Sequence, residues 1–84
     1  MSDGSGGGQG AALDAAVAVL RDAGVPLHWT VIQDRALRAG LVDPFATPNV
    51  RREVLGALRE GTRRGIVRAL GGGVYELAAP PGGD

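Results

Sequence analysis

The sequence predicts an α+β fold that is mainly helical, with three helices, one short strand and a C-terminal β-hairpin. Three observations support this prediction. Apolar residues recur at helical spacing in three segments, glycine or proline residues separate these segments, and two β-prone runs flank three consecutive glycines near the C-terminus. The chain has 84 residues and no cysteine, so one small domain without disulfides is expected.

Both ends of the chain have the composition of disordered tails. Residues 1–11 include five glycines and no large apolar residue after Met1, and residues 79–84 consist mostly of proline and glycine. The folded domain is therefore expected at residues 12–78, a length of about 67 residues that is near the lower limit for a single hydrophobic core. No signal peptide or membrane span is recognisable, and we expect a cytoplasmic protein without membrane contact.

The first helix is predicted over Ala12–Ala23, because apolar residues form a helical stripe within it and Gly24 stands at the position of a C-terminal cap. Val25–Trp29 should then be extended, since Pro26 cannot continue a helix and restricts the residue before it. This extended segment could pair as a short third strand.

The second helix is predicted to open at Thr30, with Gln33 three residues later completing a capping box, and to end at Gly40. A loop over residues 42–46 follows. Phe45 in this loop is expected to fill the edge of the core rather than to contact a ligand.

The third helix is predicted to have Thr47 as its N-terminal cap and Pro48 at its first position, where a missing backbone N–H is tolerated. It should run to about Glu60 and stop at Gly61.

A β-hairpin should follow the third helix. Two β-prone runs, Ile66–Leu70 and Val74–Leu77, flank the glycines at 71–73, which supply the backbone freedom that a tight turn requires. The order is then helix, short strand, helix, loop, helix, strand, turn, strand. This is the order of a winged helix-turn-helix, in which the hairpin is the wing.

The third helix is amphipathic on a wheel of 100° per residue. Its apolar arc, which should face the other helices, holds Val50, Val54, Ala57 and Leu58. The opposite arc holds Asn49, Arg52, Gly56 and Arg59. An exposed glycine between two arginines either allows another backbone to approach closely or reflects the glycine-rich composition, and both explanations stay open.

Positive charge is concentrated around the third helix and the hairpin. Six arginines lie between residues 51 and 68 against Glu53 and Glu60, although the whole chain has no net charge. Asn and Arg at the start of a major-groove helix suit base edges, whereas arginines beside a wing suit phosphates. The predicted DNA-binding residues are Thr47, Asn49, Arg51, Arg52, Gly56, Arg59, Arg63, Arg64 and Arg68.

The salt dependence of DNA binding follows from this set. If the five arginines from Arg52 to Arg68 all contact phosphates, about four to five counterions are displaced, and log K should fall against log salt with a slope of about −4. Glu53 and Glu60 border the same face and oppose the binding of phosphate.

The residue inventory argues against an enzyme. The chain has neither cysteine nor lysine, its two serines lie in the predicted N-terminal tail, and its single histidine, His28, has no obvious carboxylate partner. We expect His28 to be structural and Trp29 to be a core anchor at the helix junction rather than a platform for base stacking. No metal, cofactor or small-molecule substrate is expected.

Several segments together resemble the HARE-HTH winged-helix family. They are LDAAVAVLRDAGVPLHWTVI (Leu13–Ile32), RAGL (Arg38–Leu41), the TP that opens the third helix (Thr47, Pro48) and GGVYEL (Gly72–Leu77). Members of this family occur in bacterial restriction-associated proteins and in eukaryotic chromatin regulators, and a related domain begins the RNA polymerase delta subunit. The resemblance implies a tri-helical core with a β-wing, no catalysis, and a role in binding DNA or in docking on a DNA-associated machine.

Two functions from different classes follow from the sequence. The first is a winged-helix module in transcription or DNA-associated regulation that binds duplex DNA through its third helix and wing, and the clustered arginines favour it. The second is a protein-interaction module that docks on RNA polymerase or another DNA-associated partner, and the zero net charge and the two glutamates favour it.

Overall fold

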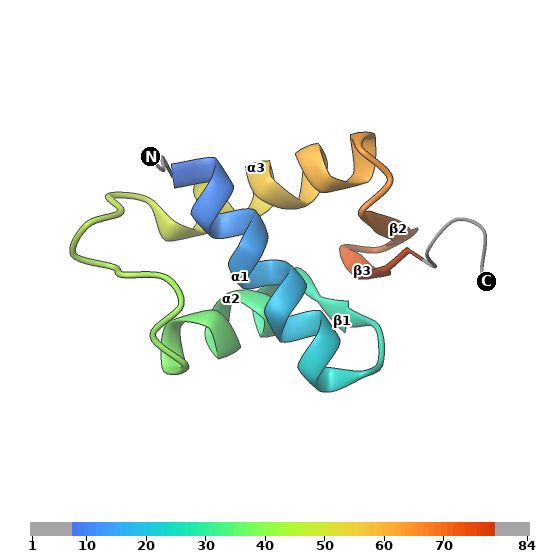
Figure 1. Ribbon diagram of the computed structural model, residues 1–84, viewed down its shortest axis with the longest axis horizontal. Helices are drawn as coiled ribbons and strands as arrows, with labels where there is room; N and C mark the ends of the chain where they lie inside the picture. Colours follow the sequence, from blue (N-terminus) through green and yellow to red (C-terminus); the bar gives the residue numbers. More distant parts are fainter. Residues whose placement is uncertain (1–7, 79–84) are drawn as a thin grey trace, which may run out of the picture.

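Residues 8–78 are the part of the chain that the computed structural model describes, and they form three helices and a three-stranded antiparallel sheet (Figure 1). The fold is therefore α+β and mainly helical, as predicted. The elements in chain order are α1 (Gly8–Ala23), β1 (Leu27–His28), α2 (Trp29–Arg38), α3 (Val50–Arg63), β2 (Val67–Gly71) and β3 (Val74–Leu77).

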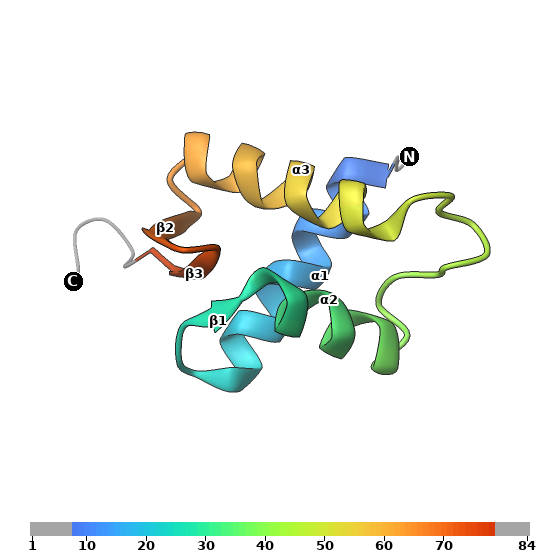
Figure 2. The same cartoon turned by 180° about the vertical axis from the view of Figure 1, so that it is seen from behind.

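The three helices enclose the core, and the sheet lies beside them. In Figure 1, α1 crosses in front of α2 and α3; seen from behind, α2 and α3 face the viewer (Figure 2). The main core cluster consists of Ala15, Ala16, Val19, Leu20, Ile32, Ala36, Val42, Val54, Leu58 and Val67.

None of the helices within residues 8–78 has the length and apolar character that crossing a membrane requires.

Helix α1 begins earlier than predicted. Residues 8–11 are helical, so the predicted helix start at Ala12 is wrong. The reason is the burial of Ala12 and Leu13, which form a small cluster with Ala57 of α3. A buried backbone N–H group needs a hydrogen-bond acceptor, and in an α-helix that acceptor is the carbonyl four residues earlier. The helix therefore extends by one turn before Ala12. The remaining parts of both predicted tails, residues 1–7 and 79–84, lie outside the described residues.

The third strand that the sequence allowed is present as β1. Leu27 pairs with Tyr75 of β3 in an antiparallel register, and β3 is the central strand in the order β1-β3-β2. Gly24 ends α1, as predicted, with a φ of 70° and its N–H donating to the carbonyl of Leu20 at 3.0 Å. The chain can therefore turn directly from α1 into the sheet.

The N-terminal cap of α2 is His28, so the predicted capping box of Thr30 with Gln33 is wrong. The backbone N–H of Thr30 donates to Nδ1 of His28 at 3.2 Å, and the same nitrogen lies 2.8 Å from the Thr30 hydroxyl. The backbone N–H of Trp29 donates to the carbonyl of Gly73 at 2.9 Å. Sheet pairing thus holds the chain extended through His28, and the helix starts at Trp29, two residues before the start that a cap at Thr30 would have set.

The C-terminus of α2 is as predicted. Gly40 has a φ of 72°, and its N–H donates to the carbonyl of Leu37 at 3.1 Å. The N–H of Leu41 donates to the carbonyl of Ala36 at 2.9 Å. This pair of bonds is a Schellman motif, which satisfies two carbonyls that the end of the helix would otherwise leave free.

Asn49, not Thr47, caps the N-terminus of α3. The Asn49 side-chain oxygen accepts the backbone N–H of Arg52 at 3.1 Å. Thr47 belongs to the preceding loop, where its N–H donates to the carbonyl of Asp43 at 2.9 Å. Because that loop turn includes Thr47, the first helical residue is Val50, and the predicted start at Pro48 is wrong.

Helix α3 also ends later than predicted. Gly61 lies inside the helix, and Gly65, with a φ of 77°, follows its end. A Cβ atom at Gly61 would lie 2.9 Å from Leu13 Cδ1 and 3.1 Å from Val67 Cγ2. Gly61 is therefore explained by the close approach of α1 and β2 to α3, and the Schellman bond from Ile66 N–H to the Gly61 carbonyl (2.8 Å) ends the helix at Arg63.

The β-hairpin lies where the sequence predicted it, although β2 begins at Val67 rather than Ile66. Ala69 pairs with Tyr75 and Gly71 with Val74, with an irregularity in register between Ala69 and Gly71. The glycines at 71–73 all have positive φ, which explains why three glycines occur together at this turn.

Phe45 is 97% exposed, so the prediction that it fills the core is wrong. The loop is held by Asp43, whose carboxylate accepts the N–H of Phe45 at 2.9 Å and whose carbonyl accepts the N–H of Ala46 at 3.1 Å. This turn leaves the ring outside the core, and Val42 is buried at this edge instead. Trp29, in contrast, is half-buried and packs against the core cluster, as predicted.

Candidate nucleic-acid interface

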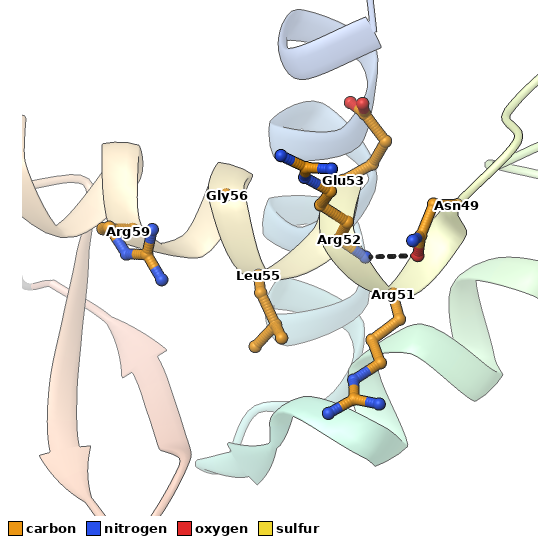
Figure 3. Close-up of a pocket in the computed structure, with 7 residues that line it drawn as sticks. All are labelled: Asn49, Arg51, Arg52, Glu53, Leu55, Gly56 and Arg59. Atoms are coloured by element: carbon orange, nitrogen blue, oxygen red, sulfur yellow. Dashed lines mark hydrogen bonds between the residues drawn. The ribbon is translucent and has the colours of Figure 1, made fainter.

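The outer face of α3 is hollowed into an open groove with a volume of about 520 Å³ (Figure 3). All the residues that line it belong to α3 or cap it: Asn49, Arg51, Arg52, Glu53, Leu55, Gly56 and Arg59. The opposite side of the helix packs into the core through Val54, Ala57 and Leu58, which are at most 1% exposed. The groove therefore brings together five of the residues that the sequence selected, and it adds Glu53 and Leu55.

Two of the groove residues are held by interactions within the protein. Asn49 uses its side-chain oxygen to cap the helix. The guanidinium carbon of Arg51 lies 5.4 Å from the centroid of the Trp29 ring, a distance typical of a cation–π contact. Figure 3 shows Arg51 directed toward α2, away from Arg52. A ligand in the groove would therefore have to compete with these intramolecular contacts for the Asn49 oxygen and the Arg51 guanidinium.

Arg52 and Arg59 are the free cations of the groove. Neither forms an ion pair with a carboxylate among residues 8–78. Figure 3 shows them on either side of Gly56 along α3, and both residues are exposed. Two full positive charges therefore flank Gly56, the groove position that carries no side chain.

Glu53 places a negative charge at the edge of the same groove. Its Oε1 atom is buried and has no hydrogen-bond partner among the described residues. In Figure 3 its carboxylate lies on the side of α3 away from Arg51. This carboxylate lowers the positive potential that Arg52 and Arg59 produce.

The three arginines nearer the hairpin lie outside the groove, and each is paired. Arg63 and Arg64 contact the two oxygens of Glu60 at 2.6 and 2.9 Å, and Arg68 contacts Oε2 of the cross-strand Glu76 at 3.0 Å. The hydrogen bond from Arg63, followed by that from Arg64, holds the pKa of Glu60 below its ordinary value of 4.5.

The structure therefore divides the predicted site residues into two groups. Asn49, Arg51, Arg52, Gly56 and Arg59 share the groove, whereas Arg63, Arg64 and Arg68 form ion pairs at the hairpin end of the molecule and Thr47 lies in the loop before α3. Helical spacing of three and four residues could have indicated the Glu60 pairs. The pair between Arg68 and Glu76 depends on strand register and has no such signal.

Comparison of the chain with protein-family models, with curated proteins and with solved structures finds no match.

Proposed function

We propose that this chain is a non-enzymatic winged-helix module that binds duplex DNA through α3, with a role in transcription or DNA-associated regulation in the bacterial cytoplasm. The element order supports it, because a hairpin that follows the third of three helices, with a short strand between the first two, is the arrangement of winged-helix proteins. The resemblance of the sequence to the HARE-HTH family supports the same class.

The observation that carries the proposal is the pair of arginines on the outer face of α3 that have no carboxylate partner among residues 8–78. Arg52 and Arg59 are two helical turns apart, a rise of about 10.5 Å, and both point away from the core arc. The major groove of B-DNA is about 12 Å wide and admits one α-helix. A helix of this kind that carries two free cations fits a polyanion of those dimensions.

The direct test is a titration of the isotope-labelled protein with a random-sequence duplex at low salt, followed by NMR. We expect chemical-shift changes to concentrate in residues 49–59. Trp29 is the only tryptophan and contacts Arg51, so its fluorescence supplies an independent signal of binding beside the groove. Absence of both signals at low salt would reject DNA binding.

A double variant tests the face itself. Arg52→Glu with Arg59→Glu should abolish duplex binding, because two attractive charges become repulsive, while the free energy of unfolding changes by no more than about 0.5 kcal/mol. The matched control is Arg21→Glu with Arg35→Glu, which makes the same change in net charge at exposed positions of α1 and α2. The control should retain most of the affinity.

The alternative function is docking on RNA polymerase or another DNA-associated protein, and the exposure of Phe45 favours it. An aromatic ring that is 97% exposed on a loop fixed by Asp43 is available to a partner with an apolar pocket. Binding to purified RNA polymerase that Phe45→Ala abolishes, and that the Arg52 and Arg59 double variant retains, would replace the DNA proposal with this one.

A further inference from the structure

We infer that the module binds duplex DNA without sequence preference, with Arg52 and Arg59 as its phosphate contacts and the three hairpin-end arginines left out. This inference rests on the proposed DNA binding and specifies how the same groove would act. It differs from the expectation based on the sequence alone, in which Asn and Arg at the start of the third helix suit base edges and all five arginines from Arg52 to Arg68 contact phosphates.

The first step concerns what α3 offers to base edges. Direct readout requires side-chain donors or acceptors that are aimed at the bases. The Asn49 oxygen is used by the helix cap and Arg51 is stacked on Trp29. Between Arg52 and Arg59 the groove is lined by Glu53, whose charge repels phosphate, and by Leu55 and Gly56, which carry no side-chain donor or acceptor. A base pair facing the middle of α3 would therefore meet little that could distinguish it from another base pair.

The second step concerns the geometry of Arg52 and Arg59. With glycine between them, the backbone of α3 can come close to the floor of the major groove. In the view of Figure 3, the Arg52 guanidinium lies above the line of α3 and the Arg59 guanidinium lies below it. Side chains that leave a helix in this way reach the phosphates that border the groove, and such contacts position a protein without reading sequence.

The third step concerns the hairpin-end arginines. Glu60 lies between Arg63 and Arg64, and Arg68 is paired with Glu76, so each would have to break an ion pair in order to bind a phosphate. The side chains in these ion pairs carry a net charge of only +1, because three arginines (Arg63, Arg64 and Arg68) are paired with two glutamates (Glu60 and Glu76). The number of counterions released on binding should therefore be set by Arg52 and Arg59.

The first experiment measures the affinity of the full chain for three 16-base-pair duplexes that are AT-rich, GC-rich and mixed. We expect the three dissociation constants to agree within about threefold at equal salt, because one correct bidentate base contact alone would separate them by about fivefold or more. A preference of about fivefold or more for one duplex would leave DNA binding standing and overturn this inference. A chain that binds none of the three at low salt would overturn the proposed function and this inference together.

The second experiment compares two double variants of equal charge. The wild type should show a slope of log K against log salt of about −2, from two phosphate contacts. Arg52→Gln with Arg59→Gln should bring the slope close to zero, whereas Arg63→Gln with Arg64→Gln should leave it within about half a unit of the wild type. Equal changes of slope in the two variants, or a wild-type slope near −4, would show that the hairpin end contacts DNA and would overturn the assignment.

The third experiment fills the centre of the groove while keeping both cations. Gly56→Leu should weaken binding to every duplex by at least about tenfold, because the side chain prevents close approach of the helix. Its melting temperature should be no lower than that of the wild type, since leucine favours a helix more than glycine does. Unchanged affinity would show that the helix does not approach DNA at Gly56 and would contradict the geometry inferred above.

Discussion

Six arginines lie between residues 51 and 68, and they occupy three different environments. Arg51 is stacked on an aromatic ring, Arg52 and Arg59 have no carboxylate partner among residues 8–78, and the three nearest the hairpin are in ion pairs. Each exposed pair contributes little to stability, typically less than about 1 kcal/mol. Their larger effect is to remove local positive charge, so a count of arginines overestimates the charge that is available to a ligand.

Glu53 provides a test at the scale of one residue. Glu53→Gln should raise affinity for duplex DNA about threefold at low salt, because a charge about 6 Å from a phosphate in water-like surroundings contributes about 0.7 kcal/mol. The substitution breaks no hydrogen bond at Glu53 Oε1, because this atom has no hydrogen-bond partner among the described residues. Fluorescence titration of Trp29 measures the effect, and Asp14→Asn, at an exposed position of α1, is the control. An affinity that falls in the Glu53 variant would mean that this carboxylate helps to bind DNA.

At the scale of elements, the start of α3 depends on a single cap. Asn49→Ala should lower the free energy of unfolding by about 1 kcal/mol, because the backbone N–H of Arg52 loses its acceptor. Thr47→Ala should change it by less than about 0.5 kcal/mol, because Thr47 lies outside the helix and its backbone bond to Asp43 remains. Urea unfolding of both variants measures the difference. A larger loss in the Thr47 variant would place the cap where the sequence alone suggested it.

The end of α3 should respond to acid through Glu60. The folded pKa of this carboxyl is lowered by Arg63 and Arg64, so its contribution to stability is present above the unfolded value of 4.5 and is lost as the pH falls through the folded value. Glu60→Gln removes this contribution. The variant should therefore be less stable than the wild type at pH 7, and the difference should shrink as the pH falls below 4.5 and vanish once the pH is below the folded pKa. Thermal unfolding across this range is the measurement, and a difference that stays constant with pH would contradict it.

At the scale of the whole molecule, Gly61 is the point where α1, α3 and β2 meet. Gly61→Val should destabilise the protein by about 1–3 kcal/mol, since the added atoms would collide with buried Leu13 and Val67. Gly56→Ala, on the groove side of the same helix, should instead stabilise it by up to about 1 kcal/mol. Thermal unfolding of the two variants compares them. Equal stabilisation of both would show that the contact around Gly61 is not tight.

The outer face of α3 was predictable because amphipathic periodicity depends only on the sequence. Val54, Ala57 and Leu58 are buried, and Arg52 and Arg59 are exposed, as a helical wheel requires. The partners of the arginines were not predictable to the same degree. Arg68 meets Glu76 only because β2 and β3 pair in one particular register.

The sequence by itself determined the order of the helices and strands, the core arc of α3 and the glycine turns at Gly24, Gly40 and 71–73, because these depend on periodicity and local backbone conformation. The tertiary structure decided the details that depend on long-range contacts. A bond from Trp29 to Gly73 made His28 a helix cap, and close packing on Leu13 and Val67 placed Gly61 inside a helix rather than at its end. The outward position of Phe45 likewise follows from the turn that Asp43 holds and from burial of Val42 in its place, neither of which the hydrophobicity of the residue could reveal.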